Sequence, residues 1–360
     1  MFVRPTPFFR CLPQSVHANI LEFIVFYAIY WARSRQLGTP FISVIIPVKP
    51  GGELTVLGSL EGVDYPHDRM EVIVAEGRRP SVQRNLAARQ AKGDILYFLD
   101  DDSLVPPKLF KTVAGRFDDP AVTAVGGPII TPDTDGFMQK GFGLVLSSPF
   151  GGSAIRARYK RLGAERAASE NDLILANLSF RRDAFIEAGG FNEGLYPNEE
   201  NELLNRLGAA GHRFLYVPDA FLYRSQRADF RAYLRQVFTY GRGRMDQNYA
   251  HPEGFRPLHM APSVFLLYCI SLLGIKSGVY FLPAIIYLIL GLVFSALAAS
   301  EGKNPFFFFV MPALFLTLHI GYGAGFIWGA LKGLLSKKCP AAPRQGGGEV
   351  TIRRVEPGRP

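Results

Sequence analysis

The chain has 360 residues, of which 48% are hydrophobic and 20% charged, and its formal net charge is +9. This length allows one to three domains. The three cysteines, Cys11, Cys269 and Cys339, lie far apart, which argues against a disulfide framework and against a zinc site built on paired cysteines. The basic residues are dispersed, so we interpret the charge as attraction to anionic lipid surfaces and predict no nucleic-acid partner.

The first predicted element is an apolar helix within residues 1–38. The segment Ile20–Trp31 is apolar apart from Glu22 and runs into Arg33 and Arg35. It is short for a membrane span, and it lacks the small-residue cleavage site of a signal peptide. We expect a helix that lies on the membrane surface or is partly inserted, and a buried helix of a soluble domain is the alternative.

Strands and helices alternate at the start of the soluble domain that we predict over residues 39–250. Short apolar runs indicate strands, and apolar residues three or four positions apart indicate a helix. The order is strand Phe41–Val48, helix Leu54–Val63, strand Met70–Ala75, helix Pro80–Lys92, strand Ile95–Leu99 and, after a further helix, strand Ala121–Gly127. This alternation is typical of an α/β domain with a parallel, doubly wound sheet.

Three carboxylates, Asp100, Asp101 and Asp102, directly follow the apolar run Ile95–Leu99. Open α/β sheets place their ligands at the carboxyl ends of their strands. Carboxylate oxygens are preferred ligands of Mg²⁺ and Mn²⁺, which complete their shells with substrate phosphates. The triplet therefore predicts a divalent-cation site that handles a phosphorylated substrate. The alternative is that Asp102 or Ser103 caps the following helix.

The first strand is not followed by a glycine-rich phosphate loop of either common type. A protein that binds a phosphorylated ligand without such a loop needs other groups to neutralise the phosphates. We therefore expect the phosphates to be held by the metal and by side chains.

Residues 258–335 form a predicted membrane region. The runs Val279–Ser300 and Pro305–Leu331 lack charged side chains and contain only one histidine, His319. Each is longer than the roughly 20 residues that a helix needs to cross the hydrocarbon core. The stretch Leu258–Ile275 is shorter, so it is either a third crossing or a helix in the membrane interface.

Basic residues follow the last span between Lys332 and Arg354, and they predict a cytoplasmic C-terminus. A cytoplasmic soluble domain then requires an even number of crossings after it, which favours two spans and an interfacial helix. Residues 336–360 are rich in Pro, Gly and Arg, and we predict a disordered basic tail. The predicted location is the cell membrane, either inner or plasma, with several crossings and a cytoplasmic catalytic domain.

Several motifs resemble a family of enzymes when they are taken together and in order. They resemble a family 2 glycosyltransferase of GT-A fold over roughly residues 41–245. The nucleotide-binding half is matched by Ser43–Pro47, Arg84–Asn85, Gly93–Asp94, Phe98–Asp102 and Val105–Pro107, and the acceptor half by Asn177–Arg182, Gly189–Glu193, Glu199–Leu203, Arg206–Leu207 and Tyr216–Ala220. Tyr240–Arg244 and His319–Gly325 resemble a membrane-anchored subgroup that includes succinoglycan-type exopolysaccharide transferases.

The resemblance implies roles on the donor side of the site. Asp100 and Asp102 match the family's D-x-D, which holds Mg²⁺ or Mn²⁺ against the diphosphate of a nucleotide sugar, where the cation neutralises charge on the leaving group. Asp101 would face the ribose. Contacts with the nucleotide are also implied for Pro47, Glu76 and Arg84; for Arg84, a solvated position on a helix is the alternative.

The resemblance also implies roles on the acceptor side. Glu200 matches the general base that takes the proton of the acceptor hydroxyl, and a solvated helix start is its alternative. Arg242 and Arg244, which follow Gln236, would clamp the diphosphate, or would anchor the domain to anionic lipid. No Trp stands beside these arginines, which argues against a processive synthase.

The chain departs from the family pattern in two places. Only seven residues separate Glu76 from Arg84, so the sheet could lack an edge element or grip the base differently. The His that often follows the Tyr216–Ala220 segment is absent, and Arg224 stands after Tyr223 instead. The basic segment Arg156–Arg161 has no matching motif, and we interpret it as a solvated loop, with a mobile loop over the acceptor as the alternative.

The predicted function is that of an inverting, metal-dependent hexosyltransferase. It moves a sugar from a UDP- or GDP-sugar to a membrane-associated saccharide or lipid, with a polyprenyl-linked acceptor favoured, in polysaccharide or glycolipid synthesis. The alternative is a catalytically idle membrane scaffold subunit of a polysaccharide assembly complex. We assign His319 no role.

Overall fold

The computed structural model describes residues 38–252, 255–275, 277–335 and 349–356. The chain divides into two units, residues 1–40 and 41–360, and the second carries all the elements described below. The helix predicted at Ile20–Trp31 lies outside the described residues, as do Cys11, Cys339 and most of the predicted tail.

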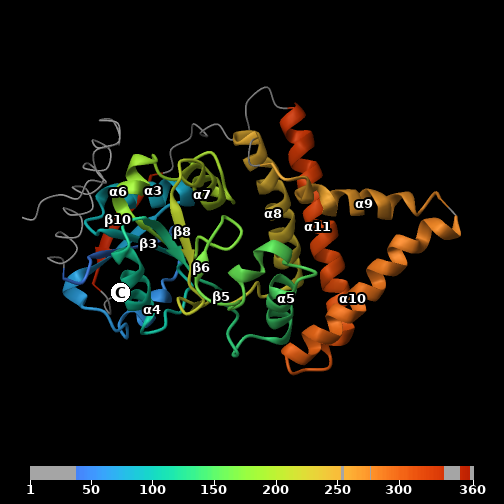
Figure 1. Cartoon of the computed structure of the whole chain (residues 1–360), viewed down its shortest axis with the longest axis horizontal. Helices are drawn as coiled ribbons and strands as arrows, with labels where there is room; N and C mark the ends of the chain where they lie inside the picture. The colour runs from blue at the N-terminus through green and yellow to red at the C-terminus, as the bar shows by residue number, and fades with distance from the viewer. Residues whose placement is uncertain (1–37, 253–254, 276, 336–348, 357–360) are drawn as a thin grey trace, which may run out of the picture. The chain divides into compact units, whose positions relative to one another are not determined.

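An eight-stranded sheet forms the centre of the second unit (Figure 1). Its strand order is β10-β2-β1-β3-β7-β4-β8-β6. The strands are β1 (Ile42–Val48), β2 (Met70–Glu76), β3 (Ile95–Leu99), β4 (Val122–Gly126), β6 (Arg166–Ala167), β7 (Asn177–Arg181), β8 (Arg213–Tyr216) and β10 (Thr351–Val355). The four strands predicted from the sequence are all present, with ends that differ by one residue at most.

The sheet is mixed, so the prediction of a wholly parallel sheet is wrong, although β4 pairs in parallel with β8. Strands β2, β1 and β3 are parallel, but β7 runs antiparallel between β3 and β4. Strand β7 follows β3 and β4 in the sequence, although it lies between them in the sheet. The alternation of strands and helices in the first half of the domain therefore gave no indication of it. The α/β class itself is confirmed.

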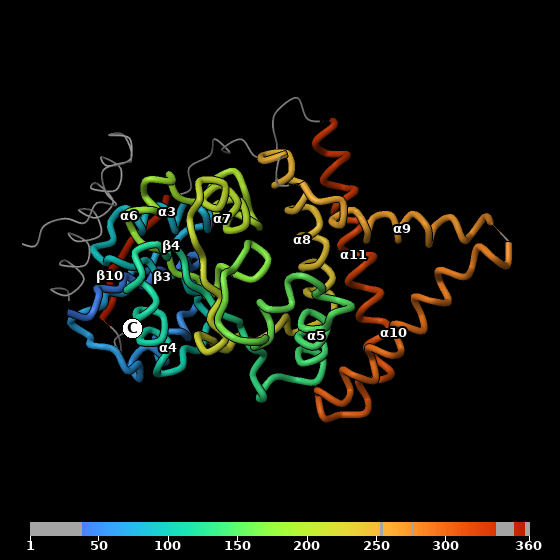
Figure 2. The backbone as a smooth tube through the Cα atoms, viewed as in Figure 1, coloured from blue at the N-terminus to red at the C-terminus, as the bar shows by residue number. Residues whose placement is uncertain are grey.

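Strand β10 occupies the edge of the sheet, against β2, in antiparallel register from Thr351 opposite Glu76 to Val355 opposite Val72. A residue run that follows the predicted membrane region therefore returns to the first half of the domain (Figure 2). This corrects the prediction of a disordered tail for residues 351–355. Strand β10 is also the edge element that we expected could be missing, given the short spacing between Glu76 and Arg84.

Helices cover both faces of the sheet. Successive side chains of β1 point to opposite faces, and each face packs against its own helices. Val44 and Ile46 pack in one cluster with α2 (Val56–Leu60) and α4 (Leu109–Ala114). Ile45 packs in the other with α3 (Pro80–Gln90), α6 (Arg182–Glu187) and α7 (Glu199–Ala209). Pro80 stands in the first turn of α3, where its missing N–H is tolerated. A separate pair of strands, β5 (Ile129–Ile130) and β9 (Leu222–Tyr223), lies beyond β4.

The remaining helices form a second group. They are α5 (Phe137–Ser147), α8 (Phe230–Ala250), α9 (Ala261–Ser271), α10 (Leu282–Glu301) and α11 (Phe307–Leu335). Helix α8 begins at Asp229, whose carboxylate accepts a hydrogen bond from the Ala232 N–H at 2.8 Å. Helices α8 and α11 lie side by side, and α5, α9 and α10 also pack on α11 (Figure 1).

Two of the described helical segments, Gly278–Glu301 and Phe307–Leu335, are long and apolar enough to cross a membrane. The segment Pro257–Ser271 is apolar but shorter. Large apolar side chains of α10 such as Ile285, Leu288 and Ile289 are about half exposed. A contiguous exposed apolar surface of this kind marks contact with a partner or a membrane rather than the interior of a soluble domain.

Candidate active site

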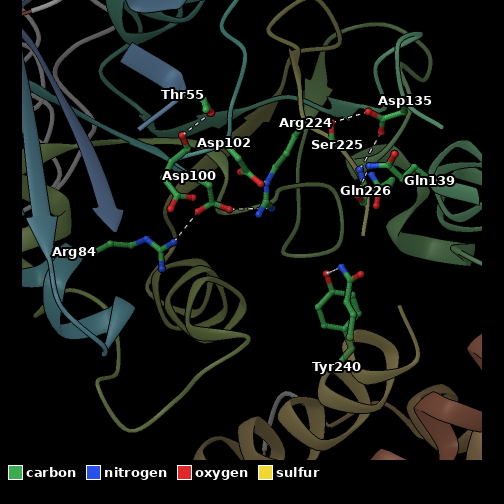
Figure 3. A network of polar contacts seen from close by, with 12 residues as sticks. Thr55, Arg84, Asp100, Asp102, Asp135, Gln139, Arg224, Ser225, Gln226 and Tyr240 are labelled. Carbon is green, nitrogen blue, oxygen red and sulfur yellow. Dashed lines mark hydrogen bonds and ion pairs between the residues drawn. The ribbon is translucent and has the colours of Figure 1, made fainter. Parts of the chain in front are cut away.

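The three carboxylates directly follow strand β3, which lies inside the sheet between β1 and β7. Figure 3 shows Asp100 and Asp102. The turn after the strand is held through the main chain of Asp101, whose carbonyl oxygen accepts hydrogen bonds from the Val56 N–H at 3.0 Å and from Thr55 Oγ1 at 3.1 Å. The flanking residues Asp100 and Asp102 both pair with Arg224. Burial, followed by the charges of Asp102 and Asp100, raises the pKa of the Asp101 carboxyl.

Two guanidinium groups contact the carboxylate of Asp100. Arg84 Nη2, from α3, lies 3.0 Å from Oδ1, and Arg224 Nη1 lies 2.9 Å from Oδ2. Arg224 Nε also lies 2.6 Å from Oδ1 of Asp102. Burial alone would raise the pKa of the Asp100 carboxyl, but Arg224 and then Arg84 more than offset it, so this pKa lies below its usual value. Asp100 is therefore ionised at neutral pH.

Asp100 and Asp102 face a common space, because the Arg224 guanidinium contacts the first through Nη1 and the second through Nε. Among the described residues, no cluster of three or more His, Cys, Asp and Glu could hold a metal. The protein would thus supply two carboxylates, and the phosphates of a substrate would complete the shell, as is common for Mg²⁺.

Arg84 connects the strand-tip carboxylates to helix α7. Its Nη1 lies 2.9 Å from Oε1 of Glu199, and both side chains are almost fully buried. Burial raises the pKa of Glu199 to about 7; Arg84 opposes this rise and the charge of Glu200 adds to it. The predicted donor and acceptor sites are therefore joined by one buried arginine. The solvated alternative for Arg84 is wrong.

Glu200 follows in the first turn of α7, where its side chain is 10% exposed. Oε1 lies 3.7 Å from Nη1 of Arg158. Through Nη2, Arg158 also donates to the main-chain oxygen of Glu170 and to Oδ1 of Asn201. Helix α7 begins at Asn198, a buried residue with φ of 81°. Glu200 is thus held in a fixed position, and the alternative of a solvated helix start is wrong.

Arg158 corrects the prediction for the segment Arg156–Arg161. We expected a solvated basic loop, but Arg158 is 5% exposed and pairs with the predicted base. The sequence carried one signal, four basic residues within six positions, but no indication that one of them turns inward. Lys160 and Arg161 do remain partly exposed, in pairs with Glu301 and Asp219.

One cavity of about 350 Å³ joins these groups to the C-terminal helices. Arg84, Asp100, Glu199 and Glu200 line it, as do Arg158, Arg224 and Arg227. Apolar and aromatic residues from the second group of helices and the turn before α9 complete the wall: Leu258, Pro262, Leu318, His319 and Tyr322. The cavity therefore has a charged part at the strand tips and an apolar part beside α9 and α11.

The other predicted site residues fall in different places. Arg244 lines the cavity and donates to Oε1 of Gln247 at 2.9 Å. Arg242, two positions earlier in α8, instead lies 3.4 Å from the main-chain oxygen of Tyr196 and 3.8 Å from Asp246. Pro47 and Glu76 lie at the ends of β1 and β2, and neither is among the cavity-lining residues.

His319 of α11 faces the cavity and has partners for both ring nitrogens. Nε2 lies 3.1 Å from the main-chain oxygen of Phe150, and Nδ1 lies 2.8 Å from the hydroxyl of Tyr287. The His319 ring therefore links α11 to the main chain of Phe150 and to Tyr287 of α10.

A family model described as glycosyl transferase family group 2 matches residues 95–330. The chain belongs to this family. It is a glycosyltransferase, and the family together with the mixed sheet confirms the GT-A fold class predicted from the motifs. The match extends from strand β3 through α11, so it includes the carboxylate triplet, Glu200 and the apolar helices.

Known proteins similar to the transferase include two curated relatives. The succinoglycan biosynthesis protein ExoA of Rhizobium meliloti is 26% identical over 68% of this chain and 72% of the relative. The pre-mycofactocin glycosyltransferase of Mycobacterium tuberculosis is 22% identical over 61% of this chain, and the match spans 43% of that relative's length.

Two solved structures are also similar. The mannosyltransferase PcManGT of Pyrobaculum calidifontis, solved with GDP-Man and Mn²⁺, is 19% identical, covers 90% of this chain and 98% of its own, and has a TM-score of 0.49. S. aureus TarS 1–349, solved with UDP, is 14% identical, covers 89% of this chain and 98% of its own, and has a TM-score of 0.41.

Proposed function

We propose that the transferase is an inverting enzyme that moves a sugar from a nucleotide diphosphate donor to a membrane-associated, polyprenyl-linked acceptor in polysaccharide or glycolipid synthesis. The observation that carries the proposal is the cavity of about 350 Å³. It places Asp100, Glu200 and apolar side chains of α11 around one space. A hydrophilic donor and an acceptor with an apolar tail can therefore meet there.

The donor side is built from Asp100, Asp102 and the guanidinium groups beside them. Asp100 and Asp102 would hold Mg²⁺ or Mn²⁺, which would neutralise charge on the leaving diphosphate. Arg84, Arg224 and Arg244 line the same cavity and can pair with phosphate oxygens, for which guanidinium has a matching geometry. Arg242 points to Tyr196 instead, so we propose Arg244 rather than Arg242 as the clamp.

The acceptor side is built around Glu200. Its carboxylate would take the proton from the acceptor hydroxyl, the hydroxyl oxygen would form a bond to the anomeric carbon, and the bond from that carbon to the diphosphate oxygen would break. A single displacement of this kind inverts the anomeric configuration. Arg158 holds Glu200 in place at 3.7 Å.

The membrane context rests on the C-terminal helices and on β10. Helices α10 and α11 are long enough to cross as a hairpin, whereas α9 is short. Strand β10 follows them and pairs with β2 of the catalytic domain, which supports both ends of the hairpin lying on one side and an even number of crossings. The basic residues after α11 favour the cytoplasmic side.

The experiment that tests the proposal uses the full chain in detergent with a panel of UDP-, GDP- and dTDP-sugars and Mn²⁺ or Mg²⁺. Metal-dependent release of the nucleoside diphosphate, lost in Asp102→Ala, supports the proposal and names the donor. Turnover that persists in Asp102→Ala with the metal chelated contradicts metal dependence. Binding of no nucleotide sugar at all would instead favour an idle scaffold subunit.

A further inference from the structure

Arg224 lies where a divalent cation would contact the two outer carboxylates. Its guanidinium reaches Asp100 through Nη1 at 2.9 Å and Asp102 through Nε at 2.6 Å (Figure 3). These are contacts with the same two side chains that we propose as metal ligands. Two cations cannot contact this carboxylate pair at once without strong repulsion, because both would lie within a few ångströms of each other.

The backbone that carries Arg224 is held on two sides. The Arg224 N–H donates to the main-chain oxygen of Ile130 at 3.0 Å. The preceding residue, Tyr223, exchanges both main-chain hydrogen bonds with Leu104, which follows the carboxylate turn by two positions. The main chain is therefore fixed beside the turn, and only the side chain can leave the carboxylates.

The side chain of Arg224 has room to move. It is 21% exposed and lines the cavity, where a diphosphate would bind. A guanidinium group binds phosphate oxygens as readily as carboxylates, and often through two parallel hydrogen bonds. A rotation of the side chain can thus exchange one anionic partner for another without a change in the fold.

We propose that Arg224 is an internal counter-ion that competes with the divalent cation for Asp100 and Asp102. Without nucleotide, the guanidinium pairs with both carboxylates and weakens metal binding. When a nucleotide diphosphate arrives, its phosphates draw the guanidinium away, which leaves Asp100 and Asp102 free to hold the metal. The proposal rests on the proposed function, since it assumes a nucleotide diphosphate donor. It predicts that metal and nucleotide bind together.

The test is a Mn²⁺ titration of the detergent-solubilised full chain, in which electron paramagnetic resonance reports the free ion. We expect Arg224→Gln to bind Mn²⁺ at least about tenfold more tightly than the wild type when nucleotide is absent. Addition of UDP or GDP should reduce this difference to less than about threefold, because the diphosphate removes the competitor in the wild type. The double variant Arg224→Gln with Asp102→Asn should lose the tight site.

Two further variants serve as controls. Arg227→Gln removes an equal charge from the same cavity, and because Arg227 acts on Asp100 less strongly than Arg224 does, it should tighten Mn²⁺ binding by less than about threefold. Arg224→Lys keeps the charge but loses the fork that spans two carboxylates, so it should fall between wild type and Arg224→Gln. Thermal unfolding of each variant identifies any that fail to fold. If Arg224→Gln does not fold, Arg224→Lys still tests the proposal.

Equal affinity for Mn²⁺ in wild type and Arg224→Gln without nucleotide would overturn the proposal, as would an equal gain in Arg227→Gln. So would an absence of Mn²⁺ binding in every variant. The titration needs no sugar transfer, so its failure is distinguishable from failure of the proposed function. A clear affinity difference in a protein that transfers no sugar from the tested donors would keep Arg224 as a counter-ion and reject the proposed donor and acceptor.

Discussion

Gly241 of α8 lies against the main chain of Tyr322 of α11, so closely that a Cβ atom at Gly241 would be 2.0 Å from the Tyr322 carbonyl oxygen. The reverse contact is equally close, because a Cβ at Gly325 would lie 2.0 Å from the carbonyl oxygen of Phe238. The two glycine-containing motifs that resemble the membrane-anchored subgroup are thus the two sides of one helix contact. This contact places a predicted membrane span beside the cavity.

We expect Gly241→Ala to destabilise the chain by about 3 kcal/mol and to abolish sugar transfer, because backbone atoms cannot move aside as a flexible side chain can. Thermal unfolding and transfer rates in detergent measure both effects. The control is Gly58→Ala in α2, where no atom lies within 4 Å of the added methyl group and helix propensity favours Ala. Equal stability of the two variants would contradict the close contact.

Glu200→Gln should lower the transfer rate by about 10² to 10⁴, since it removes the proposed base but keeps the size of the side chain. Affinity for the nucleotide sugar should change little, because the donor contacts lie at Asp100 and Arg84. Rates and calorimetric binding separate the two effects. Glu187→Gln, an exposed change on α6, is the matched control. A variant that keeps its full rate would remove Glu200 from the mechanism.

The pH dependence of stability should reveal Glu199. Its pKa rises from the usual 4.5 to about 7 in the folded chain, mainly through burial. At a pH between these two pKa values, the folded chain therefore keeps a proton on Glu199 that the unfolded chain has lost. The contribution of this group to the free energy of unfolding is lost as the pH rises through about 7.

Relative to Glu199→Gln, the wild type should lose up to about 3 kcal/mol between about pH 5 and pH 8. The Gln variant mimics the protonated form, and Arg84 keeps Asp100 as a partner in both proteins. Thermal unfolding midpoints over this pH range give the comparison. A difference that stays constant with pH would show that Glu199 is ionised throughout.

Removal of residues 349–360 should lower stability by roughly 2 kcal/mol, because β2 then loses its hydrogen-bonded neighbour. The truncation also removes the ion pair between Arg354 and Glu71, at 2.9 Å. Removal of 357–360 alone keeps β10 and is the control. Hydrogen exchange of β2 amides tests the site of the effect, and unchanged protection would contradict the pairing.

The same strand gives a prediction about orientation. A peptide tag placed after Pro360 should be accessible in sealed membrane vesicles from the side that exposes the catalytic domain. The reason is that β10 pairs with β2 only if both lie on one side of the bilayer. A tag accessible from the opposite side would require an odd number of crossings.

Local pattern was enough for the elements whose signal is contained in a few neighbouring residues. The run Ile95–Leu99 is apolar throughout, because both faces of its strand are covered, and the strand has the predicted bounds. The carboxylates after it, the length of the two apolar helices and the ordered motifs of the family were likewise readable from the chain. Each depends on side-chain periodicity, length or motif spacing.

The tertiary structure alone decided which distant residues meet. Arg84 and Glu199 are 115 positions apart, and nothing beside either residue in the sequence names its partner. Arg158 turns inward to Glu200, Arg224 lies between two carboxylates, and β10 reaches β2, because burial and strand pairing depend on how the whole backbone is placed. The sequence by itself thus determined the family, the strand-tip carboxylates and the apolar spans, whereas the ion pairs and the sheet edge required the folded chain.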